Sequence, residues 1–269
     1  MQRIISFLSL VTISIWIAVF SIDSDLHIVA CDVGQGDAIL IQKSRTQILI
    51  DSGSGNKVLD CLGRHMPFWD RQIELAISTH IDKDHSGGFP DVFNRYKIVN
   101  FLTNDLNNPM YSTQNSQVLE KVVGGSGTKV IYPDVGMVIR VGMIYLDILH
   151  PSEDFVSNKT NDYSIVTLLR YNKFKAIFTG DLELNISEDL FERDKIEPVD
   201  YIKISHHGSK NGTSEKLVQI LKPNVAIISV GKNSYGHPNE EVLNLLKKYN
   251  IKILRTDEIG DIVYNYTKQ

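Results

Sequence analysis

The chain has 269 residues, of which 42% are hydrophobic and 22% charged, so it can bury one large core and is too apolar to be disordered. Its net charge of -4 excludes a protein that binds nucleic acid through bulk positive charge. With only Cys31 and Cys61 there is no disulfide framework and no CxxC zinc site; two buried thiols are the favoured interpretation, and a single disulfide is the alternative.

The first 24 residues are expected to form a separate module. Residues 4–20 carry no charge, follow Arg3 and precede Asp23 and Asp25. This run is at the short end of a bilayer span and long for the core of a signal peptide. The flanking charges favour an inside N-terminus and an exported body. We therefore expect a membrane anchor or a signal peptide, which makes the protein membrane-anchored facing the outside, periplasmic or secreted.

Residues 25–269 are predicted to form one domain of alternating short strands and helices. Strands are expected at residues 26–33, 38–42, 47–50, 73–78, 98–102, 129–132, 137–141, 143–149, 164–170, 174–178, 201–204, 226–230, 251–255 and 261–266. Helices are expected near residues 56–66, 86–96, 114–123, 214–221 and 239–249. The first three strands read as an antiparallel meander. Two β-rich halves with helices predict an α/β (α+β) fold of two sheets packed face to face, helices outside.

One short loop concentrates imidazole and carboxylate groups. In 79-THIDKDHSGG-88, which follows a predicted strand, His80, Asp82, Asp84 and His85 stand within six positions. Carboxylates at this spacing repel one another unless a cation lies between them. The alternative, a solvated acidic loop that caps a helix at Ser86, explains each residue singly but not the four together. The loop therefore predicts a divalent metal site.

Three other strand ends offer further ligands. Asp181 follows the strand in 174-FKAIFTGDLE-183, His206 and His207 follow the next one, and His237 lies in 226-AIISVGKNSYGHP-238. Each alone is a weak signal, since such residues are usually turn or surface residues. Together they are expected at the same edge of an α/β sheet, where sites form in such folds. By contrast, 32-DVGQGD-37 reads as a scaffolding hairpin, because a strand and not a helix follows it.

The chain resembles the metallo-β-lactamase fold superfamily and, within it, the ComEC-like hydrolase domain of the competence DNA-uptake protein. The resemblance rests on motifs in family order from residue 26 onward: 32-DVGQGDAILI-41, 50-IDSG-53, 79-THIDKDHSGG-88, 161-NDYSIV-166, 179-TGD-181, 206-HHGS-209 and 236-GHP-238. It implies an αββα sandwich of two mixed β-sheets with outer helices and a dinuclear metal site. Residues 25–269 would be the hydrolase domain.

Carried over by residue, the resemblance implies two divalent metal ions, zinc or manganese. His80 and Asp82 would help hold the first ion, and Asp84 and His85 the second. Asp181 would bridge them, and either His206 or His207 would complete the second site. Where many members have a further histidine, this chain has residues 161–164, so the first ion would have an oxygen-rich shell; with Asp82 also a carboxylate, this favours harder ions such as manganese.

The expected activity is that of an exported or membrane-anchored phosphodiesterase that uses a metal-bound hydroxide, with DNA or a smaller phosphodiester as substrate. Asp84 and His237 are the expected catalytic residues, His237 protonating the leaving group or contacting a phosphate oxygen. Expected substrate contacts are Asn161, Ser164, Ser209 and Lys210. The alternatives are a non-catalytic binding module that keeps the fold, and a β-lactamase-like hydrolase. The sequence leaves the oligomeric state open.

Overall fold

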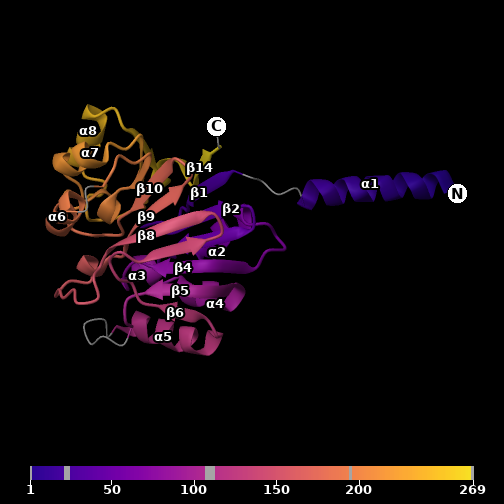
Figure 1. The fold of residues 1–269 in the computed structure, drawn as a ribbon, viewed down its shortest axis with the longest axis horizontal. Coiled ribbons are helices and arrows are strands. Elements are labelled where there is room, and N and C mark those ends of the chain that lie inside the picture. Colours follow the sequence, from indigo (N-terminus) through magenta and orange to yellow (C-terminus); the bar gives the residue numbers. More distant parts are fainter. Residues whose placement is uncertain (1, 21–24, 107–112, 194–195, 268–269) are drawn as a thin grey trace.

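The computed structural model describes residues 2–20, 25–106, 113–193 and 196–267 (Figure 1). In the described chain after residue 25, two seven-stranded sheets lie face to face, and helices cover the outer face of each. The predicted fold class and the αββα order of layers are confirmed.

The first sheet has the strand order β14-β1-β2-β3-β4-β5-β6. Its strands are β1 (Leu26–Ala30), β2 (Ile39–Lys43), β3 (Thr46–Ile50), β4 (Gln72–Ser78), β5 (Lys97–Thr103), β6 (Lys129–Ile131) and β14 (Ile262–Tyr266). The meander β1-β2-β3 is antiparallel as predicted, whereas β3, β4, β5 and β6 pair in parallel. The carboxyl ends of β3, β4 and β5 therefore lie at the same edge.

The second sheet has the order β13-β12-β11-β10-β9-β8-β7. Its strands are β7 (Val138–Val141), β8 (Ile144–His150), β9 (Val166–Tyr171), β10 (Phe174–Phe178), β11 (Tyr201–Lys203), β12 (Val225–Ile228) and β13 (Lys252–Arg255). Strands β7 to β10 are antiparallel, and β10 to β13 are parallel. The carboxyl ends of β10, β11 and β12 thus also share one edge.

The helices divide between the two outer faces. Against the first sheet lie α2 (Lys57–His65), α4 (Phe89–Arg95) and α5 (Gln114–Ser126), and against the second lie α6 (Leu184–Arg193), α7 (Glu215–Leu221) and α8 (Glu240–Lys248). Shorter elements are α3 (Lys83–Ser86), α9 (Thr256–Ile259) and the 3-10 turns η2 (Asn161–Tyr163) and η3 (Ser205–Gly208). Helix α6 was not predicted, although its buried side chains, Ser187, Leu190 and Phe191, follow helical spacing.

The helix predicted at residues 86–96 is present as α4, which begins three residues later, and a separate short helix, α3, lies in the stretch predicted to be a loop. Helix α3 ends at Ser86, and α4 begins at Phe89. Between them the backbone of Gly88 passes so close to the Ser52 carbonyl that a Cβ would lie 2.3 Å from its oxygen. This close approach of two backbones requires glycine and separates the loop that carries His80 to His85 from the helix after it.

Strand alternation builds the layers. In β1, Leu26, Ile28 and Ala30 face the core between the two sheets, whereas Val29 faces the layer of α2, α4 and α5. Both faces of the central strands are therefore apolar, which is why these strands read as continuous hydrophobic runs. A third core packs α6, α7 and α8 on the second sheet. Because both faces of the strands are apolar, the polar side chains of the candidate site lie at the edge where the strands end.

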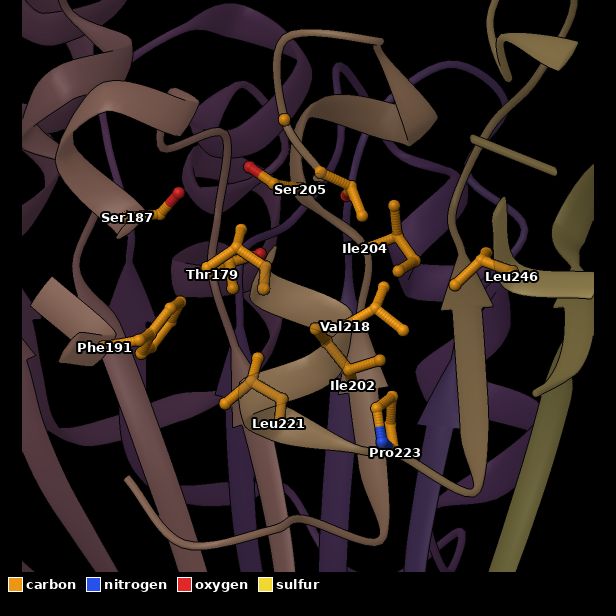
Figure 2. A pocket seen from close by; sticks show the side chains of 13 residues that line it. Thr179, Ser187, Phe191, Ile202, Ile204, Ser205, Val218, Leu221, Pro223 and Leu246 are labelled. Atoms are coloured by element: carbon orange, nitrogen blue, oxygen red, sulfur yellow. The ribbon is translucent and has the colours of Figure 1, made fainter. Parts of the chain in front are cut away.

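A small cavity interrupts the third core (Figure 2). Its volume is about 10 Å³, and its apolar lining includes Phe191 from α6, Leu221 from α7 and Ile202 from β11. This is room for one water molecule at most, which is too little for a ligand.

The apolar N-terminal segment forms the helix α1 (Gln2–Phe20), and its large side chains from Ile4 to Ile13, together with Trp16, are exposed. Among the described residues, no helix is both long and apolar enough to cross a membrane.

The two cysteines form a disulfide, so the favoured expectation of two free thiols is wrong. Cys31 follows β1 and Cys61 lies in α2, with their Cα atoms 5.8 Å apart. Both are fully buried in the helix-facing core of the first sheet. Their spacing of 30 residues carried no sequence signal, because only the docking of α2 beside β1 brings them together. The bond ties the end of β1, and with it residues 32–37, to α2.

We expect the disulfide to stabilise the fold by roughly 3 kcal/mol, because it closes a 30-residue loop and so lowers the conformational entropy of the unfolded chain. Urea unfolding with and without dithiothreitol should show a lower midpoint in the reductant. A Cys31→Ala, Cys61→Ala double variant should unfold at the lower midpoint under both conditions. Equal midpoints for the native protein with and without reductant would contradict the bond.

Candidate metal centre

Both sheets contribute side chains to one point at their shared edge. The first sheet supplies Asp37 before β2, Asp51 after β3 and the loop after β4 that carries His80 to His85. The second supplies Asp181 after β10 and His207 after β11. Residues from distant parts of the chain meet there because the parallel strands of each sheet end at this edge.

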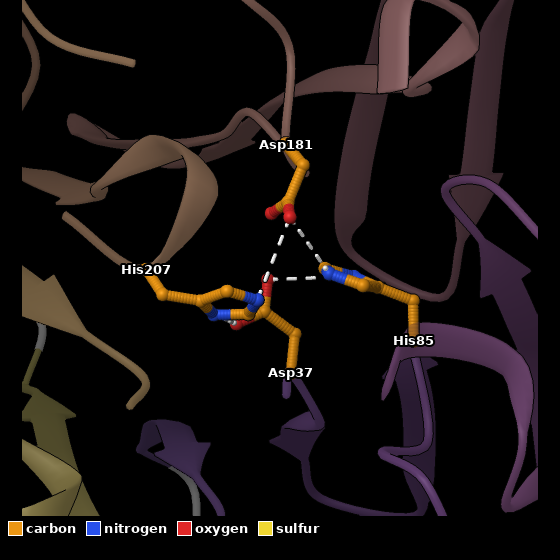
Figure 3. Close-up of side chains that lie close together, drawn as sticks. All are labelled: Asp37, His85, Asp181 and His207. Carbon is orange, nitrogen blue, oxygen red and sulfur yellow. Dashed lines mark ion pairs between the residues drawn. The ribbon is translucent and has the colours of Figure 1, made fainter. Parts of the chain in front are cut away.

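Four fully buried residues form the centre of this cluster (Figure 3). Asp181 Oδ2 lies 3.2 Å from His85 Nε2 and 3.4 Å from His207 Nε2. Asp37 lies on the other side of both rings, 3.6 Å from His85 Nδ1 and 3.5 Å from His207 Nδ1. The two carboxylates therefore differ in position: Asp181 faces the Nε2 atoms, and Asp37 faces the Nδ1 atoms.

The Nε2 atoms are the unsatisfied groups. Those of His80, His85 and His207 are buried and have no hydrogen-bond partner. Asp84 Oδ2 lies 3.3 Å from His207 Nε2, and Asp82 Oδ2 lies 3.8 Å from His80 Nε2. Buried imidazole nitrogens without partners, surrounded by carboxylate oxygens, fit divalent cations, for which both groups are ligands.

Hydrogen bonds at Nδ1 turn these rings toward one another. His85 Nδ1 bonds Asp51 Oδ2 at 2.9 Å, and His207 Nδ1 bonds the Ser229 carbonyl at 2.8 Å. The Thr79 hydroxyl donates its hydrogen to Asp51 at 2.7 Å, so at 3.1 Å it accepts from His80 Nδ1. Nδ1 thus keeps a proton in each ring, so Nε2 is the nitrogen that a metal can bind.

Local backbone strain accompanies this arrangement. His206 and His207 have φ values of 51° and 53°, and Asp51 has a φ of 59°. Left-handed conformations are uncommon for residues other than glycine and cost free energy. Ser209 N–H donates to the His206 carbonyl at 2.8 Å, and Asp51 N–H donates to the Ile77 carbonyl at 2.8 Å, which holds both turns in place. The strain presents three functional side chains at the sheet edge.

The carboxylates of the cluster raise the pKa values of two of its three buried histidines. Burial lowers the pKa of His207, but the neighbouring carboxylates of Asp181, Asp37 and Asp84 outweigh it and raise the pKa to about 9. Burial is likewise outweighed at His85, where Asp181, Asp51 and Asp37 hold the pKa well above its usual range. Burial, together with the charge of His85, lowers the pKa of His80 to about 3. Protons on His85 and His207 balance the carboxylates wherever no cation does.

Lys203 neutralises the inner part of the cluster. This residue of β11 is 1% exposed, and its Nζ pairs with Asp37, donates to the Gly180 carbonyl at 2.9 Å and lies 3.4 Å from Asp181 Oδ1. Burial lowers the pKa of Lys203, but Asp37 and Asp181 overcome this and raise it. Lys203 is therefore a buried counter-ion of the site and does not reach solvent.

The structure distinguishes the two adjacent histidines. His207 is 2% exposed and lies in the four-residue cluster, whereas the Nε2 of the partly exposed His206 is 4.0 Å from Asp181. The geometry thus favours His207 as the ligand. The ring of His237 lies 5.7 Å from that of His206, at the outer side of the site.

The residues expected to contact substrate lie in different environments. Ser164 is fully buried, and its hydroxyl accepts from Asp181 N–H at 3.0 Å, which positions the Asp181 loop. Ser209 is 5% exposed and lies directly after the turn η3. Asn161, in η2, is partly exposed, and Lys210 is exposed. Lys210 and Asn161 are accessible to a substrate, and Ser164 is not.

Sequence reasoning missed three residues of the site. The segment that contains Asp37 reads as a scaffold in the sequence, and neither Asp51 nor Lys203 is among the expected site residues. Asp51 directly follows a buried strand in 50-IDSG-53, a signal of the same kind that identified Asp181. Asp37 and Lys203 have no such signal, because each is recognised only when the two sheets are docked.

A second group of possible ligands lies elsewhere, at α2. Cys61, His65 and Asp261 are close together, but the Cys61 sulfur is bonded to Cys31. Asp261 Oδ2 already pairs with His65 at 2.8 Å and with Arg64 at 2.7 Å. The group is a structural ion-pair cluster.

The two-sheet fold and the histidine and aspartate cluster at the shared edge agree with the family to which the sequence belongs. The chain belongs to the metallo-beta-lactamase superfamily, whose family model matches residues 31–232. ComE operon protein 3 of Bacillus subtilis is 29% identical over 260 residues and Recombination protein 2 of Haemophilus influenzae is 30% identical over 244; each alignment covers 87% of this chain. The alignments cover 32% and 28% of those two proteins, so the chain spans about three tenths of their length.

Among solved structures, the metallo-beta-lactamase fold protein YhfI from Bacillus subtilis superposes with a TM-score of 0.63 at 12% identity. The match covers 90% of this chain and all of YhfI. At this identity the likeness shows the fold alone. The relation to ComEC-like competence proteins, expected from the motifs, is confirmed.

We expect metal binding to strengthen as the pH rises from about 6 to about 9. The raised pKa values of His85 and His207 mean that both rings hold protons at neutral pH without a cation, so a cation must displace these protons. Calorimetric titration of the metal-free protein with Mn²⁺ or Zn²⁺ in buffers of different ionisation enthalpy measures the protons released. Binding that releases no protons and is independent of pH would contradict this arrangement.

We expect Asp51→Asn to weaken metal affinity by about 10- to 100-fold, although Asp51 faces away from the Nε2 atoms. An amide cannot accept from both the Thr79 N–H and the His85 Nδ1, because one of its two ends is a donor. Competition with a chelating dye measures the affinity. Asp60→Asn, at an exposed aspartate of α2, is the control that should leave it unchanged. Equal affinity in both variants would show that Asp51 does not orient His85.

Proposed function

We propose that the protein is a metal-dependent phosphodiesterase that acts on DNA or on a smaller phosphodiester. The observation that carries the proposal is the convergence of three unpartnered, buried Nε2 atoms with the carboxylates of Asp84 and Asp181. Further support comes from the family and from the competence proteins that match most of this chain.

The proposed ligands fall into two sets that share Asp181. His80 and Asp82 form one, and Asp84, His85 and His207 form the other. When bound, two divalent cations activate a water molecule and neutralise charge on a phosphoryl group. Three imidazoles with three carboxylates suit both zinc and manganese, and the oxygen-rich first set favours manganese there.

His237 is the proposed proton donor. Burial and the neighbouring His206 and His207 lower its pKa, so its ring is neutral at pH 7. A neutral ring can donate its N–H to a phosphate oxygen. The negative charge of a bound phosphodiester raises the pKa of His237, which favours a proton on the ring where a leaving oxygen needs one.

We further propose that the hydrolase domain works outside the cytoplasm, with residues 1–24 as its anchor or export signal. The Cys31–Cys61 disulfide supports this location, because such bonds persist in oxidising compartments. The apolar side chains exposed along α1 are consistent with a segment that contacts lipid or is removed on export.

The test compares three substrates at a fixed concentration of Mn²⁺ or Zn²⁺: bis-p-nitrophenyl phosphate, single-stranded DNA and a cephalosporin. We expect turnover of the phosphodiesters and none of the cephalosporin. Asp84→Asn should lower kcat/KM at least 100-fold, since it removes a carboxylate from the centre, whereas the control Asp60→Asn should retain full activity.

Phosphodiester turnover that survives in Asp84→Asn would overturn the mechanism. Cephalosporin turnover alone would favour a β-lactamase. Metal binding without any turnover would favour a non-catalytic binding module.

A further inference from the structure

A row of rings runs from solvent to the metal centre along the loop between β12 and α8. The side chain of Tyr235 is 75% exposed, and its ring stacks on that of His237 with centroids 6.0 Å apart and an interplanar angle of 25°. His237 in turn lies 5.7 Å from His206, whose Nε2 is 4.0 Å from Asp181 Oδ2. Tyr235 is thus the outermost member of a continuous row that ends at the ligands.

Hydrogen bonds hold the backbone of the loop that carries Tyr235 in place, although the Tyr235 ring itself is exposed. The side chain of Asn233 accepts from Tyr235 N–H at 3.0 Å and from His237 N–H at 3.1 Å, and it donates to the carbonyls of Gly231 at 2.9 Å and His237 at 2.8 Å. The Gly231 N–H donates to Gln35 Oε1 at 3.3 Å, which ties the loop to the first sheet. Asn233 therefore makes four bonds within one turn and fixes its backbone.

A fixed, exposed aromatic ring is suited to binding a flat ligand. Exposure of a large ring brings no stability to the fold, and the fixed backbone reduces the entropy lost when a ligand stacks on it. Single-stranded nucleic acids are bound in this way, because every base has a face that stacks on an aromatic ring whatever its identity. Lys232, three residues earlier in the same loop, is also exposed and carries a positive charge.

We propose that Tyr235 is a stacking platform for a base of a single-stranded nucleic acid whose phosphodiester lies at the metal centre. The inference rests on the proposed phosphodiesterase function and narrows its substrate class to base-bearing strands. A phosphodiester without a base has nothing to stack on the ring. Tyr235 would position the strand and would not take part in the chemistry.

The experiment measures binding and turnover separately in the full-length protein. The probe is a short single strand of thymidines with one 2-aminopurine, whose fluorescence is quenched when the base stacks; an abasic strand of equal length is the matched ligand. Binding is measured in the Asp84→Asn background, where cleavage is expected to be at least 100-fold slower. Turnover is measured with Asp84 intact.

We expect Tyr235→Ala to weaken binding of the base-bearing strand about 5- to 150-fold, the range for loss of one stacked base. Binding of the abasic strand should change less than twofold. Tyr235→Trp should restore affinity and quenching, and the loss of kcat/KM in Tyr235→Ala should be carried by KM. Phe68→Ala removes a ring that is 74% exposed before β4, at the opposite end of that strand from the centre, and should change neither strand's affinity.

Three results would overturn the inference: equal affinity of Tyr235→Ala and the unsubstituted protein for the base-bearing strand, equal weakening for the abasic strand, and no binding of either strand by the unsubstituted protein. Absence of turnover with a Tyr235-dependent quenching signal would overturn the phosphodiesterase function instead and leave the base contact standing. Turnover of both strands without dependence on Tyr235 would support the phosphodiesterase function and overturn the base contact.

Discussion

The fold depends on a set of buried charges that neither sheet can balance alone. Asp37 and Asp51 belong to the first sheet, and Asp181 and Lys203 belong to the second; all are at most 3% exposed. Removing a carboxylate from water costs several kcal/mol unless an opposite charge or hydrogen bonds compensate it. Asp37 obtains its compensation from Lys203 across the interface, so the two sheets must dock with this edge in register.

The cluster has two layers with different roles. In the inner layer, Lys203 neutralises Asp37 and also contacts Asp181 Oδ1, while Asp51 receives three hydrogen bonds, from the Thr79 N–H and hydroxyl and from His85. In the outer layer, the Oδ2 atoms of Asp84 and Asp181 face imidazole Nε2 atoms that have no partner. The inner layer is balanced and orients the rings, whereas the carboxylates of the outer layer are balanced by protons on His85 and His207 or by a bound cation.

The contiguous part of the site was predictable because its chemistry is local. His80, Asp82, Asp84 and His85 stand in one loop, and Asp181 and the pair His206 and His207 follow strongly apolar strands, so the strand ends predicted that these groups lie close together. The choice between the two histidines required the structure. Asp37 was not predictable in this way, because the glycines around it explain a turn equally well. Lys203 and the Cys31–Cys61 pair depend on register and docking, which leave no pattern in a single sequence.

Close packing at the edge explains why the glycine-rich hairpin is part of the site after all. A Cβ on Gly36, whose φ is 134°, would lie 2.2 Å from the Asp84 carbonyl oxygen, and the Asp37 N–H donates to that same carbonyl at 3.1 Å. The hairpin therefore packs directly on the loop that carries His80 to His85 and fixes the position of the Asp84 backbone. The hairpin is therefore both a scaffold and a part of the site. Its turn, which only glycine permits, places Asp37 behind the histidine rings.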